Sequence, residues 1–466
     1  MLNLEPETSN FLTSNRETSM DYRELMQDLL GDAGRRGASG AEVLVVEDEA
    51  FSVRVRMRSI DTLQNAREKR LGLRLCFGQR SATTATSDLS RESLRRLLDD
   101  TVAMAQATAE DPCGGLPEPE AFASSVPDLS LWDPEPGNLP MPDRIGLAEA
   151  AEAAALDFDP RISNSEGAEY DQGDARILFA NDHGFSGEYR ASSMSLSVSP
   201  VAKDNGSMQR DGWYSVARRF KTLESPQTIG RTAAQRTLRR LGARKVATQR
   251  VPVVFDPDMA ASLLRSLCGA VSGSAIYRGA SFLVGKLERQ VAVPELTVMD
   301  DGRMEGGLGS KPFDGEGLPT RKTLVIQDGI LASYLLDTYS ARKLGLQSTG
   351  NASRAIGQRP TVGPTNFFLV PGPHTPEAII RSVERGLYVT ELIGFGVNLV
   401  TGDYSRGAAG IWIEGGELAY PVEEITIAGN LNEMLREIEM IGSDLEWRGS
   451  IAAPTLKIGR MTVAGN

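Results

Sequence analysis

Residues Thr401–Leu431 have the sequence TGDYSRGAAGIWIEGGELAYPVEEITIAGNL, in which two apolar stretches flank a pair of glycines. The first stretch is the run Ile411–Ile413. The second places apolar or aromatic side chains at every second position of Leu418–Val422. Two such stretches around Gly415-Gly416 predict a β-hairpin with a tight turn of the primed type.

The segment before this hairpin, Gly402–Gly407, has glycine at both ends and Tyr404 and Arg406 between them. This composition predicts a loop that permits close backbone approach and polar recognition. The alternative is a plain surface connection that only turns the chain into the hairpin.

Length, charge and cysteine content restrict the class of protein. A chain of 466 residues is too long for one ordinary hydrophobic core, so we expect two or three domains. Its 62 acidic and 50 basic residues give a net charge of −12, which opposes non-specific binding to nucleic acid or to an anionic membrane. No apolar run approaches the length of a transmembrane helix, and the N-terminus lacks the apolar core of a secretion signal. Three scattered cysteines argue against a disulfide framework and favour a reducing cytoplasm.

Residue types along the chain divide it into five parts. Residues 111–142 contain eight of the 24 prolines, which indicates a linker with extended backbone. Residues 20–110 combine helical periodicity with alternating strands and predict an α+β domain with a largely antiparallel sheet. The other parts are a disordered N-terminus over 1–19, a β-rich middle region over 143–222 and a mixed, β-rich C-terminal domain with packed helices over 223–466. The predicted fold class of the whole chain is α+β.

Capping residues mark the expected helix starts, because a side-chain oxygen there can accept from the free N–H groups of the first turn. Four such starts are predicted, at Asp21, Ser90, Ser225 and Thr375. The helix after Thr375 is expected to close at Gly386, and a last long helix is expected to begin at Asn430. The buried side of that last helix would hold Leu431, Met434, Leu435, Ile438 and Ile441. Asp328-Gly329 predicts a second hairpin turn.

Four further blocks of sequence, together with Thr401–Leu431, resemble a known protein family. The blocks are RISNSEGA at 161–168, ANDHGFSG at 180–187, SGSAIYRGASF at 272–282 and PFDGEG at 312–317. In their residues and in their order along the chain, these blocks are similar to the TldD/PmbA family, and specifically to its PmbA (TldE)-like branch. The resemblance covers most of the chain but not residues 1–19.

The resemblance raises the question of a metal site. The TldD branch looks like a zinc peptidase, with a His-Glu-x-x-x-His helix and a later cysteine that leave one zinc position open for the attacking water. In this chain the matching helix is Ala260–Ala270. Arg265, Ser266 and Ala270 stand where the first histidine, the glutamate and the second histidine would be. The matching C-terminal segment, Gly449–Ala453, has no cysteine. We therefore expect neither a zinc ion nor a catalytic residue on this chain.

The two histidines of the chain do not provide a metal site or a catalytic base. His183 lies in a turn composition between two strands, and His374 lies just before the Thr375 cap. A nucleophilic hydrolase needs a base within hydrogen-bond reach of its nucleophile, and the sequence contains no Gly-x-Ser-x-Gly elbow. Both histidines are expected to be structural.

Three residues are candidates for contact with an extended peptide: Tyr404, Arg406 and Arg265. A peptide could add as a strand beside them, because backbone hydrogen bonds bind with little sequence preference. Arg265 lies in an otherwise apolar helix, so it must be paired or reach solvent. We expect it to contact a carboxylate or a carbonyl in the cavity that zinc would occupy elsewhere in the family. The alternative is a surface arginine at the edge of the helix.

The resemblance implies that the chain is the TldE-like subunit of a two-chain metallopeptidase. A TldD-like partner of the same fold would carry the zinc. The complex, a heterodimer or larger, would hydrolyse peptides or unfolded protein segments through a zinc-bound water. A homodimer in the absence of the partner stays open. Two alternatives are a self-sufficient metalloprotease of the family and a peptide-binding, chaperone-like module without hydrolysis. Neither nucleic acid nor a membrane is an expected partner.

Overall fold

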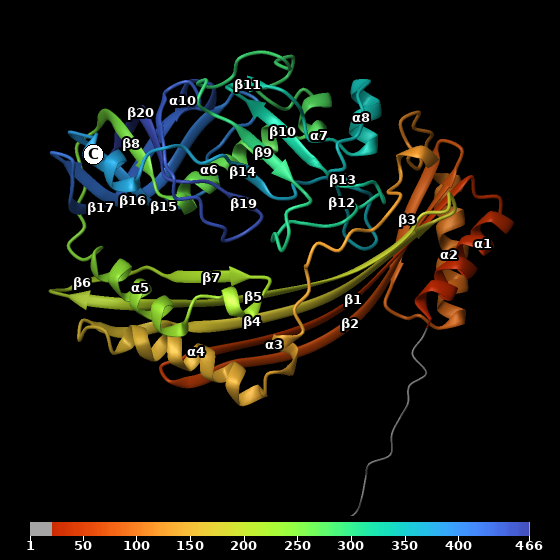
Figure 1. Cartoon of the computed structure of the whole chain (residues 1–466), viewed down its shortest axis with the longest axis horizontal. Helices are drawn as coiled ribbons and strands as arrows, with labels where there is room; N and C mark the ends of the chain where they lie inside the picture. Colours follow the sequence, from red (N-terminus) through yellow and green to blue (C-terminus); the bar gives the residue numbers. More distant parts are fainter. Residues whose placement is uncertain (1–20, 466) are drawn as a thin grey trace, which may run out of the picture.

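The computed structural model describes residues 21–465, so the expectation for residues 1–19 lies outside the described residues. A long curved sheet forms one layer, and a C-terminal part made of shorter elements lies over its concave side (Figure 1). Within the described range, no helix combines the length and the apolar character that crossing a membrane requires.

The curved sheet has seven strands in the order β3-β2-β1-β4-β5-β6, and β7 pairs with β5. The strands are β1 Gly40–Arg56, β2 Ser59–Phe77, β3 Arg80–Thr86, β4 Ile162–Asn181, β5 Ser186–Asp204, β6 Ser207–Arg210 and β7 Trp213–Ala217. All neighbouring strands are antiparallel. Because β1 pairs directly with β4, residues 20–110 and 143–222 both contribute strands to one sheet.

Two pairs of helices cover one face of this sheet, one pair near each end (Figure 1). The helices are α1 Tyr22–Arg35 and α2 Arg91–Ala107 in the first pair, and α4 Met141–Leu156 and α5 Pro226–Leu238 in the second. The first pair packs on Val43 and the second on Phe51. Both residues occupy odd positions of β1, whose side chains point to the same face. The crossing chain between α2 and α4 contains only the short turns Pro119–Ala121 and α3 Glu135–Asn138, and a further turn, Phe220–Thr222, precedes α5.

The C-terminal part contains three further sheets. The largest has the order β17-β16-β15-β8-β20-β18, and a β17–β20 pairing closes five of its strands into a barrel. Its strands are β8 Gln249–Phe255, β15 Arg385–Ile393, β16 Asp403–Glu414, β17 Glu417–Asn430, β18 Ile438–Ile441 and β20 Leu456–Ala464. The second sheet contains β9 Val298–Asp301, β10 Lys322–Gln327, β11 Ile330–Leu331, β14 Phe367–Leu369 and β19 Ile451–Ala452; the third pairs β12 Ala352–Ser353 with β13 Thr361–Val362. The helices of this part are α6 Pro257–Ala270, α7 Gly273–Tyr277, α8 Thr338–Leu344, α9 Pro376–Arg381 and α10 Leu431–Met434. The α+β class predicted from the sequence is confirmed.

Both predicted hairpin turns are formed. Gly415 and Gly416 have φ angles of 59° and 78°, and Asp328 and Gly329 have φ angles of 49° and 78°. Positive φ at both central residues is the mark of a type I′ turn, whose twist matches that of the flanking strands. The four predicted helix caps are also confirmed, because each accepts a hydrogen bond from a backbone N–H in the first turn of its helix: Asp21, Ser90, Ser225 and Thr375.

Two local predictions before and inside the barrel are wrong. Gly402–Gly407 is not a loop, because β16 begins at Asp403 and pairs with β17 from that residue onward. The glycines and polar residues of this segment give no strand pattern in the sequence. The strand forms because β16 pairs with its neighbours β15 and β17. The helix after Thr375 ends at Arg381 and does not reach Gly386, which lies in β15.

The prediction of a long helix after Asn430 is also wrong. Only α10, a single turn, is helical, and Ile438–Ile441 form strand β18 against β20. The apolar residues of this segment are buried at a spacing that fits a helix, so their side chains alone did not distinguish the two structures. Pairing with β20 supplies the backbone hydrogen bonds that favour the strand.

Candidate peptide-binding site

Helix α6 forms where the sequence predicts it. Asp256 caps the helix by accepting from the Met259 N–H at 2.9 Å, and burial raises the pKa of the Asp256 carboxyl to about 6. The leucines of the helix face the core. The less buried side of the helix carries four residues at helical spacing, which we call the α6 polar face: Ser262, Arg265, Ser266 and Gly269.

Strand β16 brings one of the three candidate residues to this face. Tyr404 and Arg406 are two positions apart, so their side chains lie on the same side of the strand. Arg406 donates from Nη1 to Ser262 Oγ at 2.8 Å and from Nη2 to the Leu392 carbonyl at 3.4 Å. Tyr404 is 2% exposed and belongs to the hydrophobic core, where burial raises its pKa to about 12. Arg406 therefore contacts the α6 polar face, whereas the Tyr404 ring lies inside the fold.

Arg265 lies one turn from Ser262 and is exposed. It forms neither a hydrogen bond nor an ion pair with a described residue, so the expected contact with a carboxylate or a carbonyl is not present within residues 21–465. The position matches the alternative of a surface arginine at the edge of the helix. Arg265 nevertheless lies one turn after Ser262, the residue that Arg406 contacts, so both arginines belong to the neighbourhood of the α6 polar face.

The segment before β19 forms a second boundary of this neighbourhood. Helix α6 packs against β19, so Gly449–Ala453 lies beside it. The Arg448 guanidinium lies 3.6 Å from the centre of the Trp213 ring and donates to the Tyr214 carbonyl at 2.7 Å. Both aromatic residues belong to β7. The curved sheet therefore reaches the α6 region through β7.

The side chains at α6 do not have the donor chemistry of a zinc site. Arg265 offers a cation, the Ser266 hydroxyl donates to the Ser262 carbonyl at 3.5 Å, and Ala270 has no donor atom. Within residues 21–465, no three His, Cys, Asp or Glu side chains are grouped so that they could hold a metal ion. The histidines lie where the sequence placed them, His183 in the β4–β5 turn and His374 just before α9. No catalytic step is therefore assigned to a metal on this chain.

A cavity that the sequence did not predict lies beside the curved sheet. This cavity of about 770 Å³ is lined by Val126–Asp133 of the crossing chain, by Glu188–Arg190 of β5, and by Arg219 and Lys221. On its free side β5 pairs with β7 only from Met194 onward, so residues 188–190 pair with β4 alone. The cavity thus combines a strand edge that has no neighbouring strand at residues 188–190 with side chains of both charges, since four carboxylates lie among its three cations.

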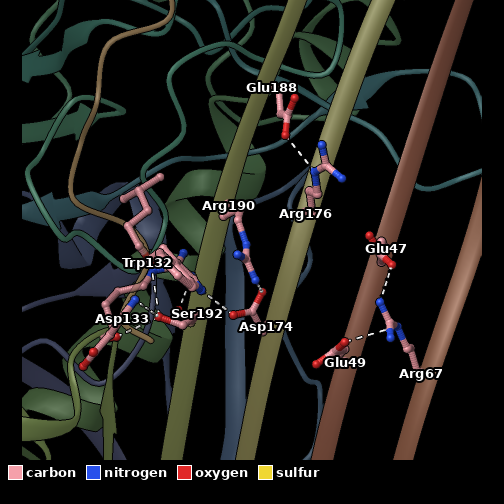
Figure 2. A network of polar contacts seen from close by, with 12 residues as sticks. Glu47, Glu49, Arg67, Trp132, Asp133, Asp174, Arg176, Glu188, Arg190 and Ser192 are labelled. Carbon is pink, nitrogen blue, oxygen red and sulfur yellow. Dashed lines mark hydrogen bonds and ion pairs between the residues drawn. The ribbon is translucent and has the colours of Figure 1, made fainter. Parts of the chain in front are cut away.

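Alternating charges cover the neighbouring face of β1, β2, β4 and β5 (Figure 2). The ion pairs are Arg67–Glu47 at 2.8 Å, Arg67–Glu49 at 3.1 Å, Arg176–Glu188 at 2.7 Å and Arg190–Asp174 at 3.1 Å. Trp132 of the crossing chain donates from its indole nitrogen to Asp174, and the Arg190 guanidinium lies 4.1 Å from the centre of the Trp132 ring.

Three family models match consecutive parts of the chain. They describe PmbA/TldA metallopeptidase domain 1 over residues 41–105, the central domain over 134–241 and the C-terminal domain over 248–465. The chain is also 38% identical to Metalloprotease PmbA of Escherichia coli O157:H7, over 92% of this chain and 93% of that protein. The chain belongs to the PmbA/TldD family. The family recognised in the sequence is confirmed, and the α6 region lies in the C-terminal domain of a PmbA/TldD-family chain.

Solved structures agree with this assignment. A proposed modulator of DNA gyrase from Bacteroides thetaiotaomicron superposes with a TM-score of 0.89 at 29% identity, covering 96% of this chain and 100% of that one. TldE from Thermococcus kodakarensis superposes with a TM-score of 0.86 over 95% of this chain and 100% of that one. Because its identity is 21%, this second likeness shows that the two proteins share a fold.

Proposed function

We propose that this chain is the TldE-like subunit of a two-chain metallopeptidase that hydrolyses peptides or unfolded protein segments. In this proposal a TldD-like partner of the same fold holds the zinc, and the assembly is a heterodimer or larger. Family membership and the identity to Metalloprotease PmbA support peptide hydrolysis as the activity. One observation supports assigning the zinc to the partner and not to this chain: Arg265, Ser266 and Ala270 supply no zinc ligand at α6.

In this proposal the chain's own part is to hold substrate. Arg406 and Arg265 place guanidinium groups along the α6 polar face, and such groups donate readily to peptide carbonyls and carboxylates. Tyr404 would support Arg406 from the core side of β16, because its ring is buried there. The zinc held by the partner would supply the activated water that attacks the peptide bond. We place the complex in the cytoplasm, and the three free cysteines support this placement.

Peptide hydrolysis should require both chains. A flexible peptide or casein should survive incubation with this chain alone and should be cut when a TldD-like chain is added. The measurement is the release of peptide fragments by each chain alone and by the mixture, with and without a chelator. Cleavage by this chain alone that a chelator blocks would instead favour the self-sufficient metalloprotease. Tight peptide binding without cleavage in any mixture would favour the chaperone-like module.

Replacing Arg406 by alanine should slow peptide cleavage by the complex about tenfold, which corresponds to the loss of one charge-assisted hydrogen bond to substrate. Assembly with the partner and the melting temperature should change little, because Arg406 is only half-buried. Ser262→Ala is the matched control, since it removes the acceptor of Arg406 Nη1 but keeps the cation. Unchanged turnover in a well-folded Arg406→Ala complex would remove Arg406 from the site. Activity lost only in proportion to the folded fraction would indicate a folding role.

A further inference from the structure

A second cavity lies where the C-terminal part meets the β3 end of the curved sheet, and we call it the α7–α8 cavity (Figure 1). It measures about 740 Å³, a volume typical of sites that hold small molecules. Its walls come from helices α7 and α8, from residues 359–362, from residues 108–112 of the crossing chain, and from β2 and β3. None of its lining residues belongs to the α6 polar face.

The most buried cation of this cavity is Arg74 of β2, which is 6% exposed. Its Nη1 donates to Glu42 and its Nη2 donates to the Gly115 carbonyl at 3.1 Å, whereas its Nε has no hydrogen-bond partner among residues 21–465. Glu42 also accepts from Arg354, whose Nε and Nη2 likewise lack partners in the described range. One carboxylate therefore serves two buried guanidinium groups, and several of their N–H donors stay unmatched.

Two exposed arginines stand at the mouth of the cavity, and neither has a carboxylate partner among the described residues. Arg278 donates from Nε to the Tyr277 hydroxyl at 3.1 Å, and Arg359 donates from Nη2 to the Ser81 carbonyl at 3.5 Å. Each guanidinium group is thus held by one neutral acceptor and keeps further N–H donors for a ligand. The fork of such donors matches the paired oxygens of carboxylate and phosphate groups.

Four carboxyl groups also line the cavity, and the two from the crossing chain are engaged by cations of this chain. Glu110 pairs with Arg80 at 3.3 Å. Asp111 pairs with Lys343 at 3.3 Å and accepts from the Tyr339 hydroxyl at 2.7 Å. These two carboxylates therefore do not compensate the arginines at the mouth.

The other two carboxyl groups accept from backbone N–H groups of α8. Asp337 caps the helix by accepting from the Ser340 N–H at 2.8 Å, and Glu316 accepts from the Thr338 N–H at 2.9 Å. Burial raises the pKa of Glu316, which favours its neutral form relative to an exposed carboxyl group. The charge of the cavity that has no partner within the described chain is therefore positive.

We propose that the α7–α8 cavity binds a small organic oxyanion, either a phosphate ester or a polycarboxylate. The charged group of this ligand accepts hydrogen bonds from Arg278 and Arg359 at the mouth, and the rest of the ligand extends toward Arg74. The net charge of −12 on the whole chain opposes a nucleic acid or an anionic membrane as the source of the oxyanion, which favours a small molecule. The site needs no partner chain, so it stands independently of the proposed function.

The test is the dissociation constant of this chain for inorganic phosphate and for citrate, measured by titration calorimetry at constant ionic strength with chloride as the reference anion. Both probes should bind more tightly than chloride, which has no paired oxygens, and both should raise the melting temperature. Arg278→Gln and Arg359→Gln should each raise the dissociation constant of the tighter probe about tenfold, because each removes a charge-assisted hydrogen bond. Arg250→Gln is the matched control, since Arg250 is an exposed arginine of β8 outside the cavity, and it should change the constant less than twofold.

Hydrogen exchange locates the bound probe on the wild-type protein, so the test stays decisive even if a variant fails to fold. The bound probe should slow backbone exchange over residues 274–278 and 359–362. Tighter binding of phosphate supports a phosphate ester, and tighter binding of citrate supports a polycarboxylate. Phosphate and citrate that bind no better than chloride would overturn the proposal. Binding that neither arginine variant weakens, or that protects other segments alone, would also overturn it.

Discussion

Replacing Glu42 by glutamine should lower the free energy of unfolding by about 3–5 kcal/mol, because it leaves two buried guanidinium groups without a counter-charge. Glu42 of β1 is 0% exposed and accepts from Arg74 Nη1 of β2 at 3.2 Å. It also accepts from Arg354 Nη1 of the C-terminal part at 2.8 Å. The carboxylate therefore joins two strands of the curved sheet to the domain above them.

A second buried carboxyl group, that of Glu316, remains near the two arginines. Glu316 interacts electrostatically with both arginines, but burial, together with the negative charge of Asp314, raises the pKa of Glu316 to about 8. Burial therefore favours the neutral form of Glu316 relative to an exposed carboxyl group, which weakens its compensation of the arginines.

The measurement is the unfolding midpoint of Glu42→Gln in urea, compared with that of wild type. Glu92→Gln is the matched control, because Glu92 forms an exposed ion pair with Arg96 at 3.0 Å and its loss should not shift the midpoint measurably. A Glu42→Gln protein as stable as wild type would show that Glu42 does not hold the two parts together.

Local signals in the sequence predicted the fold well where the structure is itself local. A cap such as Ser90 and a turn such as Gly415-Gly416 depend on neighbouring residues, and both are formed. The first half of β2, Ser59–Arg70, is nearly all exposed and has no apolar alternation, so nothing in its side chains marks a strand. It is extended because β1 supplies a partner along its whole length. Pairing with a partner strand, rather than the pattern of its own side chains, likewise makes Ile438–Ile441 a strand in place of the predicted helix.

The candidate site was predictable only in part, because its contacts join distant segments. The sequence pointed to Arg406 and to helix α6 separately, whereas the hydrogen bond from Arg406 to Ser262 spans 144 residues. The Glu42–Arg354 pair spans 312 residues and had no signal in the sequence. Tyr404 was expected beside a bound peptide, but the alternation of β16 could not be recognised in a segment taken for a loop, and its ring is in the core.

The location of the zinc is the central claim of the proposed function, and metal removal and analysis test it directly. Three or four donors such as histidine, cysteine or carboxylate hold a structural or catalytic zinc, and the α6 residues supply none of them. We expect chelator treatment of the complex to abolish peptide cleavage, and added zinc to restore it through the TldD-like chain.

The decisive measurement is zinc per chain after dialysis, determined by elemental analysis on this protein alone, on the TldD-like chain alone and on their complex. The account predicts well under one zinc per chain for this protein and about one zinc per heterodimer for the complex. One tightly held zinc in the isolated protein would contradict the account, because it would place a metal site on a chain whose α6 carries Arg265, Ser266 and Ala270.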